Sequence, residues 1–394
     1  MIRSAKPKPT VDRARGALAI LELIEDEGLT RQKVDAFVAK HSFPIVEGSN
    51  CTFLFRGEAE EVTLRHWIFG LPSSQPFQHI GGTDLWFLVM EIPACSRVEY
   101  KLEVVHHGHG RWIEDPLNPN RARDPFGANS VIFGAGYEAP QWAETDAEAR
   151  AGTFQDITFQ SEAFGDERRL TIYLPARFRR TRQYPLLLVH DGGDYLQYSG
   201  LKNVLDNLIY RLEIPELVAV LTYPNDRLRE YANDERHARF LTEEVIPKLE
   251  TDYPLRRAPG ARCLMGASFG AVAALSTAVR YPQVYGRLLL QSGSFAFTDI
   301  GTNHQRGPVF DPVVEFMNAY RARPAKVAER AFVSCGIYES LIYENRSLVP
   351  VLQSTGMDVR FVEARDGHNW ENWRDRLREG LSWLFPGPLW MVYE

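Results

Sequence analysis

Cysteine is scarce in this sequence, which has four in a chain of 394 residues: Cys51, Cys95, Cys263 and Cys335. Because these residues lie far apart and form no Cys-x-x-Cys pair, neither a zinc knuckle nor a dense disulfide scaffold is indicated. Long apolar runs are missing as well. No stretch of about 18 apolar residues occurs, so no transmembrane helix is predicted. We expect free thiols, no membrane partner and a cytoplasmic location.

An excess of positive charge is also missing, since the formal net charge is −6. A chain with this balance has no global field that would attract nucleic acid or an anionic membrane surface. The N-terminus lacks the features of a signal peptide, because acidic residues follow its short apolar run at 17–23 and no small-residue cleavage site is evident. The net charge therefore predicts no nucleic-acid partner, and the pattern at the N-terminus predicts no signal peptide.

The length of the chain exceeds what one hydrophobic core usually organises, which predicts two domains. Helical periodicity followed by β-rich runs predicts a helical segment at 1–45 and a small Ig-like β-sandwich at 46–137. An acidic, alanine-rich stretch at 138–152 is interpreted as a linker. The second domain is expected at 153–394.

The second domain has the pattern of a sheet that is covered on both faces. After two strands at 153–160 and 168–174, short continuous apolar runs alternate with helical segments, which is typical of a mostly parallel sheet. This pattern predicts the α/β class. The apolar runs lie at 186–189, 217–221, 262–265, 287–290, 331–334 and 359–362.

The strongest local motif is Gly-Ala-Ser-Phe-Gly at 266–270, directly after the apolar run at 262–265 and directly before a predicted helix. A Gly-x-Ser-x-Gly turn between a strand and a helix holds its serine in a strained backbone conformation and presents the hydroxyl above the sheet. The motif predicts the α/β-hydrolase fold, with Ser268 as the nucleophile of a serine hydrolase. The alternative is a tight turn with a buried serine.

A serine hydroxyl needs a base to remove its proton, and in this fold the acid and the histidine follow the serine along the chain. His304 and His368 are the two histidines after Ser268. His368 alone also follows a predicted strand near the end of the chain, so we assign it as the base. The alternative is a loop histidine that caps a helix.

The acid that orients this histidine should follow the strand predicted at 331–334, and Glu339 provides a carboxylate there. It would hold the tautomer of the histidine and stabilise the imidazolium. Three other carboxylates near this strand and the next remain alternatives: Glu344, Asp358 and Asp366.

Backbone N–H groups must also stabilise the oxyanion of acyl transfer. One usually belongs to the residue after the nucleophile, here Phe269, and the other to the loop after the strand at 186–189. In that loop we assign Gly193, because glycine lets the backbone approach a substrate closely. An ordinary strand-to-loop turn is the alternative.

Three histidines, His106, His107 and His109, lie in a glycine-containing turn between β-rich runs. With no carboxylate or cysteine at ligand spacing, they are interpreted as an exposed hairpin tip. We expect no metal and no cofactor.

Together these motifs resemble those of the putative esterases that include the enterochelin esterases, over nearly all of 153–385. The β-rich front part also resembles the N-terminal domain of those enzymes. The resemblance implies ester hydrolysis by Ser268, His368 and an acid at position 339. The matching segments include Asp191-Gly-Gly, Asp226-Arg227, Gly336-Ile-Tyr-Glu339 and Gly367-His368-Asn-Trp370.

The resemblance also implies a small-molecule ester substrate, such as an iron-loaded siderophore trilactone. Arg227, Arg229 and Trp370 are assigned to substrate binding, although the two arginines could equally form an ion pair with Glu230. The sequence departs from the family pattern at Ala271, where a second glycine is frequent, which weakens the assignment of one substrate.

The predicted function is therefore carboxylic-ester hydrolysis through an acyl-enzyme. An acyltransferase that uses the same triad and a non-catalytic glycan-binding protein are the alternatives. The intact set of catalytic residue types, in the expected order, favours an enzyme over the glycan-binding protein.

Overall fold

The computed structural model describes residues 18–298 and 307–388. The chain divides into two compact units, Met1–Glu138 and Ala139–Glu394. The segment interpreted as a linker begins at this boundary, but most of it belongs to the second unit. Its 3₁₀-helix η1 (Gln141–Ala143) buries Trp142 in a core cluster of that unit.

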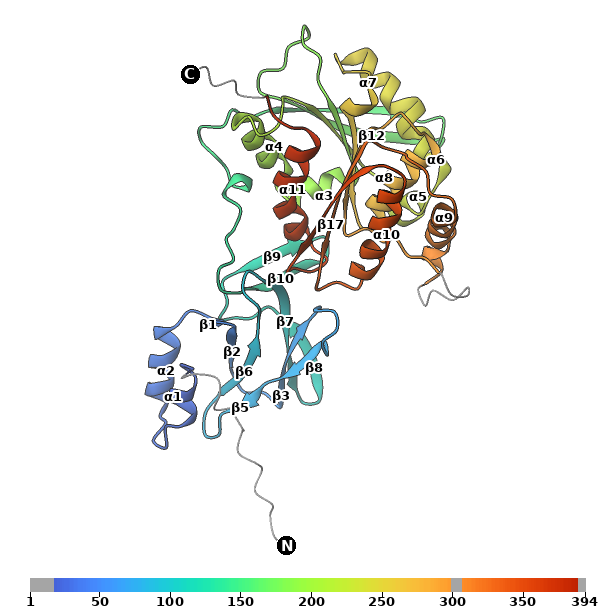
Figure 1. Cartoon of the computed structure of the whole chain (residues 1–394). Helices are drawn as coiled ribbons and strands as arrows, with labels where there is room; N and C mark the ends of the chain where they lie inside the picture. The colour runs from blue at the N-terminus through green and yellow to red at the C-terminus, as the bar shows by residue number, and fades with distance from the viewer. Residues whose placement is uncertain (1–17, 299–306, 389–394) are drawn as a thin grey trace. The chain divides into compact units, whose positions relative to one another are not determined.

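In the described part of the first unit, two short helices precede two antiparallel sheets (Figure 1). One sheet has the order β1-β2-β6-β5, and the other has the order β4-β3-β7-β10-β9, with β8 paired to β7. The elements are α1 (Leu21–Ile24), α2 (Arg31–Lys40), β1 (Ile45–Glu47), β2 (Asn50–Arg56), β3 (Glu61–His66), β4 (Ser74–Pro76), β5 (Gln78–His79), β6 (Leu85–Glu91), β7 (Arg97–His106), β8 (His109–Ile113), β9 (Arg121–Asp124) and β10 (Gly127–Phe133).

The two sheets of this unit meet through buried aromatic side chains. Phe53 of β2 and Tyr100 of β7 pack edge to face, with ring centroids 5.0 Å apart. The Tyr100 hydroxyl donates a 2.6 Å hydrogen bond to the buried carboxylate of Asp115. Polar contacts of this kind order the Pro- and Asn-rich stretch that follows β8, because buried polar groups need partners.

The second unit is built on one sheet with the order β11-β12-β14-β13-β15-β16-β17-β18, counted over the described residues. Strands β11 and β12 are antiparallel, and the strands from β14 through β18 pair in parallel. The strands are β11 (Thr153–Gln160), β12 (Glu167–Leu174), β13 (Leu186–Val189), β14 (Val218–Thr222), β15 (Arg262–Ala267), β16 (Arg287–Gln291), β17 (Arg330–Gly336) and β18 (Asp358–Ala364). The predicted apolar runs thus form the parallel strands.

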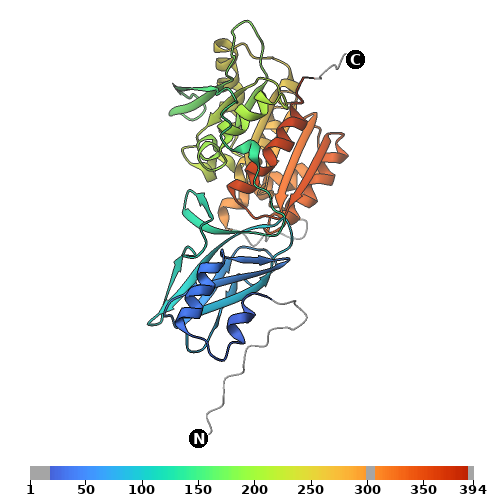
Figure 2. The same ribbon diagram turned by 90° about the vertical axis from the view of Figure 1, so that its left-hand side faces the viewer.

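Helices lie on both faces of this sheet (Figures 1 and 2). They are α3 (Gly192–Tyr198), α4 (Leu201–Tyr210), α5 (Arg227–Tyr231), α6 (Glu235–Arg239), α7 (Ile246–Asp252), α8 (Phe269–Arg280), α9 (Asp311–Ala322), α10 (Ile342–Ser354) and α11 (Trp370–Leu384). Short 3₁₀ turns add η3 (Pro259–Ala261) and η4 (Pro308–Phe310).

Successive residues of a strand point to opposite faces, so each central strand contributes to two cores. In β13, Leu186 and Leu188 belong to the core cluster that contains α7 and α8, whereas Leu187 and Val189 belong to the one that contains α4 and α11. This two-sided burial explains why the strand sequences are continuously apolar and do not alternate.

The helical segment that precedes β15 is not one regular α-helix. Helix α6 passes into a π-helical turn, η2 (Phe240–Val245), before α7 begins. Pro247 stands in the first turn of α7, and its lack of a backbone N–H disrupts the regular helical hydrogen bonds.

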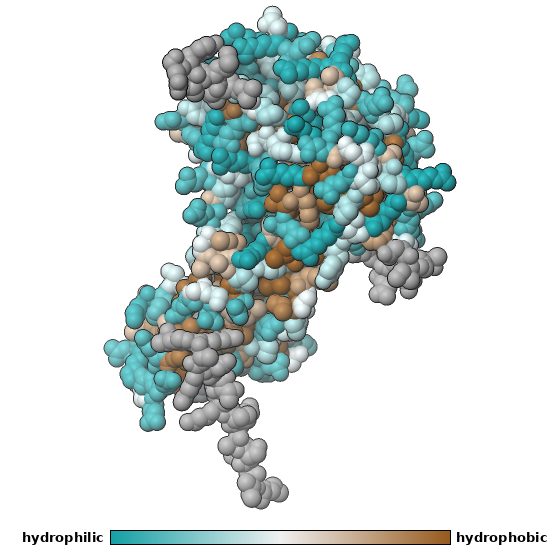
Figure 3. Space-filling model, viewed as in Figure 1, coloured by the Kyte–Doolittle hydropathy of each residue, from teal (hydrophilic) through white to brown (hydrophobic). Residues whose placement is uncertain are grey.

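The outer surface is mostly polar on the side seen in Figure 3, where hydrophilic side chains surround scattered apolar ones. Among the described residues, no helix is both long enough and apolar enough to cross a membrane.

Candidate active site

Ser268 stands at a sharp turn between β15 and α8. Its backbone has φ 57° and ψ −122°. Residues other than glycine rarely adopt this conformation, because it costs conformational free energy. The turn is so tight that a Cβ at Gly266 would lie 2.3 Å from the carbonyl oxygen of Gly270. Glycine is therefore required at 266, and the strained serine is held at the carboxyl end of the central strand.

The hydroxyl of Ser268 lies beside a second serine. Its Oγ is 3.1 Å from the Oγ of Ser294, and the Ser294 N–H donates to the Ser268 carbonyl over 3.2 Å. The Ser268 N–H donates to the carbonyl of Gln291, the last residue of β16. Ser268 is partly exposed, so its hydroxyl is open to a substrate.

Glu339 and His368 form a hydrogen-bonded pair at the same edge of the sheet. The Nδ1 of His368 lies 2.5 Å from Oε2 of Glu339. The Glu339 side chain is 4% exposed and that of His368 is 37% exposed. Because Nδ1 faces an ionised carboxylate, it donates a hydrogen to that oxygen, and in the neutral tautomer with this arrangement the lone pair lies on Nε2.

The carboxylate of Glu339 has further donors. Its Oε1 accepts a 2.6 Å hydrogen bond from Ser292 Oγ and a 2.8 Å bond from the Gly336 N–H. Burial acts to raise the pKa of Glu339, but the charge of His368 and the hydrogen bonds from His368, Ser292 and Gly336 outweigh it. The pKa of Glu339 is therefore lowered, and the carboxylate remains ionised beside the histidine.

The structure joins Ser268 and the Glu339–His368 pair through β16 and α11, not through a direct hydrogen bond. Gln291 accepts from the Ser268 N–H, and its amide donates 2.8 Å to the carbonyl of Trp373. The ring of Trp373 packs edge to face on His368, with centroids 5.1 Å apart. Within the described residues the Ser268 hydroxyl pairs with Ser294, a contact from which it can rotate toward an approaching base.

The two assigned oxyanion donors stand in the first turns of two helices, where backbone N–H groups have no acceptor within the helix. Phe269 is the first residue of α8, and Gly193 is the second residue of α3. The strands that lead into these helices, β15 and β13, are parallel neighbours. Both N–H groups therefore lie at the edge of the sheet that carries Ser268.

The structure gives a different reason for glycine at 193 from the one that the sequence suggested. A Cβ at Gly193 would lie 2.8 Å from the ring of Tyr223. Tyr223 directly follows β14, so the glycine lets α3 pack closely against the neighbouring strand.

The comparison with known protein families agrees with this geometry. Residues 161–384 match the family model described as putative esterase, which is more than half of the chain. The chain belongs to the putative esterase family. It is a hydrolase that acts on carboxylic esters, as the sequence predicts.

Relatives of this esterase differ in how much of the chain they match. The uncharacterized protein YjcH of Bacillus subtilis is 28% identical over 239 residues, which is 59% of this chain and 97% of the relative. The iron(III) enterobactin esterase of Escherichia coli O6:H1 is 25% identical over 343 residues, which is 78% of this chain and 82% of the relative.

Solved structures show the fold. The ferric enterobactin esterase of Salmonella typhimurium superposes with a TM-score of 0.73 at 21% identity, covering 89% of this chain and 98% of that one. The enterobactin esterase of Shigella flexneri has a TM-score of 0.71 at 22% identity, covering 89% and 97%. The predicted α/β-hydrolase fold, preceded by a sheet domain, is confirmed.

The two arginines that the sequence assigned to substrate binding in this esterase differ in their surroundings. Arg227 forms a bidentate ion pair with Asp191, with both N–O distances at 2.8 Å. Glu230, the partner considered for the arginines, instead binds the buried Arg168 at 2.9 Å. The alternative pairing with Glu230 is therefore not formed, because Arg168 of β12 occupies that carboxylate. Arg229 is exposed.

Trp370 is placed in the core of the esterase. It is 7% exposed, and its ring packs edge to face on Trp373 and Tyr195 with centroids 4.6 and 5.2 Å away. Its role in this structure is to support α11, the helix that begins just after His368.

The three histidines at 106–109 form a hairpin tip. His106 and His109 are paired across β7 and β8, and His107 stands in the turn with a φ of 50°. All three are exposed, and no cluster of three metal-ligating side chains occurs in the described residues. His304, the other histidine after Ser268, lies outside the described residues.

Two residues that contact the site were not singled out from the sequence: Ser292 and Ser294. The segment Ser-Gly-Ser at 292–294 directly follows the buried strand β16 and lies at the catalytic edge. Small polar residues at the carboxyl end of a parallel strand are a signal that could have identified the two serines.

Proposed function

We propose that this esterase works through an acyl-enzyme on Ser268, with His368 as the base and Glu339 as the acid that orients it. The observation that carries the proposal is the 2.5 Å pair between His368 Nδ1 and the buried Glu339 carboxylate, at the same edge of the sheet as the strained Ser268. With Nδ1 donating to the carboxylate, the neutral ring has its lone pair on Nε2, which is the tautomer that a base requires.

In the proposed first step, Ser268 Oγ bonds to the ester carbonyl carbon while its proton moves to His368 Nε2. The N–H groups of Phe269 and Gly193 stabilise the oxyanion of the tetrahedral intermediate. When the intermediate collapses, the bond to the alcohol oxygen breaks and His368 returns the proton to the leaving alcohol. The acyl group then remains on Ser268.

Water completes the cycle. His368 takes a proton from water as the water oxygen attacks the acyl carbon, and the bond to Ser268 Oγ then breaks. The serine recovers the proton and the acid product leaves. Glu339 remains ionised throughout and stabilises the imidazolium in both halves of the reaction.

For the substrate we propose a siderophore ester, such as the iron-loaded trilactone. The iron(III) enterobactin esterases among the relatives support this class of small molecule, because they align with most of both chains. The exposed Arg229 offers a cation to an anionic catecholate at the rim of α5. Arg227 already compensates the charge of Asp191, so its contribution to substrate binding would be to hold Asp191 in place.

A substrate panel tests both parts of the proposal. Hydrolysis of ferric enterobactin, a feruloyl ester, an acetylated sugar and a p-nitrophenyl acyl ester would be followed by chromatography, with Ser268→Ala as the matched control. We expect the siderophore to have the highest kcat/KM and every activity to depend on Ser268. A higher kcat/KM for the feruloyl or acetyl ester would reject the siderophore and leave the serine mechanism standing.

A further inference from the structure

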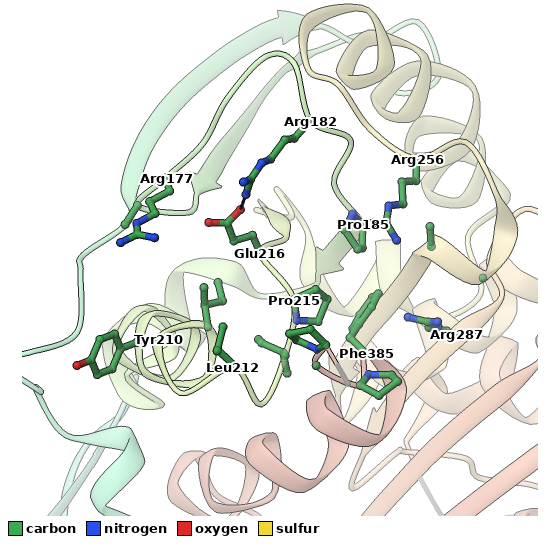
Figure 4. Close-up of a pocket in the computed structure, with 18 of the residues that line it drawn as sticks. Arg177, Arg182, Pro185, Tyr210, Leu212, Pro215, Glu216, Arg256, Arg287 and Phe385 are labelled. Atoms are coloured by element: carbon green, nitrogen blue, oxygen red, sulfur yellow. Dashed lines mark hydrogen bonds and ion pairs between the residues drawn. The ribbon is translucent and has the colours of Figure 1, made fainter. Parts of the chain in front are cut away.

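The second unit contains a cavity of about 960 Å³ at the end of the sheet opposite the catalytic residues (Figure 4). Pro185 precedes β13, Ala261 precedes β15 and Arg287 begins β16, so the lining lies at the amino ends of these strands. Ser268 follows the carboxyl end of β15. At ~3.3 Å per residue, the six residues of that strand separate the two places by about 20 Å.

The cavity lining is strongly positive. One carboxylate, Glu216, is found among the lining side chains of the described residues, and Arg182 binds it at 2.9 Å. Four further arginines line the cavity without a lining carboxylate to balance them. They are Arg150, Arg177, Arg256 and Arg287.

Arg287 is the cation held most deeply. Its Nε is buried and has no acceptor among the described residues, and its guanidinium lies 4.5 Å from the centroid of the Phe385 ring. Burial lowers the pKa of Arg287, and the nearby charges of Arg330 and Arg256 add to this effect, while Glu329 opposes it. The Nε itself is sealed off, but the residue is partly exposed and lines the cavity, so an anion bound there would balance a cation that no lining carboxylate neutralises.

The rest of the lining is apolar. Leu212, Ile214, Pro215 and Phe385 are apolar residues of the lining. Figure 4 shows Leu212, Pro215 and Phe385 below Arg177, Arg182 and Arg256, with Arg287 beside Phe385. The volume is at the upper end of that of sites for small organic ligands. A bare inorganic anion would leave most of this surface without a partner, whereas a ligand with an apolar body would cover it.

We propose that this cavity binds an amphipathic organic carboxylate, with its carboxylate group against Arg287 and Arg256 and its acyl or aryl body on the apolar residues around Phe385. Guanidinium groups suit this role because their planar N–H pairs match the geometry of a carboxylate. The site is independent of the ester hydrolysis at Ser268, since it draws on none of the residues placed there.

Calorimetric titration of the full chain with octanoate tests the proposal, with octanol and inorganic phosphate as probes that lack the charge or the apolar body. We expect octanoate to bind at least tenfold more tightly than either. Arg287→Met and Arg256→Met should each weaken octanoate binding about tenfold or more, because each removes a charged hydrogen-bond donor. Arg239→Met, at an exposed arginine of α6 outside the cavity, should leave it within twofold.

Three results of this titration would contradict the proposed site. Absence of measurable octanoate binding at millimolar concentration would overturn the proposal, as would equal binding of octanol or phosphate. Octanoate binding that both cavity variants leave unchanged would belong to another place, such as the catalytic edge, and would also overturn it. The variants should remain folded, because methionine keeps the apolar stem of Arg287 on Phe385 and removes a buried charge; exposed Arg256 provides the independent variant.

Discussion

The Oγ of Ser292 donates a 2.6 Å hydrogen bond to Oε1 of Glu339, the carboxylate oxygen that does not face His368. Ser292 in turn accepts a 2.9 Å hydrogen bond from the indole N–H of Trp373. The acid is therefore anchored from β16 and α11 as well as from its own turn. A carboxylate held in this way keeps its orientation toward the imidazole.

Removing the hydrogen bond from Ser292 should lower activity, because the Glu339 carboxylate would be held less firmly toward His368. Ser292 has a φ of 45°, so Ser292→Gly deletes the hydroxyl without adding backbone strain. We expect kcat on a p-nitrophenyl ester to fall about tenfold, the effect of one lost hydrogen bond to a charged group. In a Glu339→Gln background the same change should cost little, because coupled residues are not additive. Equal losses in both backgrounds would assign Ser292 a purely structural role.

Ser268→Ala should abolish hydrolysis of the same activated ester. Loss of the nucleophile removes covalent catalysis, so we expect kcat to fall by a factor on the order of 10⁴ or more. Circular dichroism and the melting temperature should be unchanged, since alanine fits the same backbone. A folded variant that retains even a tenth of the activity would contradict the assignment.

Glu339→Gln should leave the histidine in place but with the wrong tautomer. A glutamine amide offers an N–H as readily as an oxygen, so Nδ1 of His368 no longer has to carry the proton. We expect kcat to fall by about 10³- to 10⁴-fold, as for other buried acids in this role. Glu344→Gln is the matched control, because Glu344 was the neighbouring alternative, and it should retain nearly full activity.

The ionised Glu339 should make the fold sensitive to acid. Its pKa is lowered from 4.5 in the folded state, because the charge of His368 and the three hydrogen bonds outweigh the effect of burial. The stabilisation is therefore fully present above about pH 4.5 and is lost as the pH falls through the lower folded value. The melting temperature of the wild type, relative to Glu339→Gln, should decline over that window. A difference that grows as the pH falls would contradict the assigned shift.

Gly266→Ala should destabilise the second unit. The added Cβ would lie 2.3 Å from the carbonyl oxygen of Gly270, and because the clashing atoms are backbone, no side-chain rotation can relieve the contact. We expect the free energy of unfolding in urea to drop by about 2–4 kcal/mol. Gly307→Ala is the control, because a Cβ there meets nothing within 4 Å, and it should leave that free energy unchanged.

The sequence alone identified the parallel sheet and placed three chemical groups on it. Continuous apolar runs marked the central strands β13 through β17, since strands covered on both faces need few polar side chains. The edge strand β18 is less buried and was marked by a shorter apolar pattern. The carboxyl ends of parallel strands meet at one edge, so the order of Ser268, Glu339 and His368 along the chain was enough to predict that edge. Pairing across the first unit was less predictable, because β9 and β10 occupy a stretch rich in proline, asparagine and glycine.

Only the tertiary structure determined the contacts between segments that lie far apart in the chain. Arg227 binds Asp191 across 36 positions, Glu230 binds Arg168 across 62, and Ser292 reaches Glu339 across 47. The local sequence pattern does not identify such partners. Each charged side chain pairs with a group that the packing of the chain brings close to it. The same packing buried Trp370 and collected arginines at the amino ends of the strands, where the sequence shows them as separate residues.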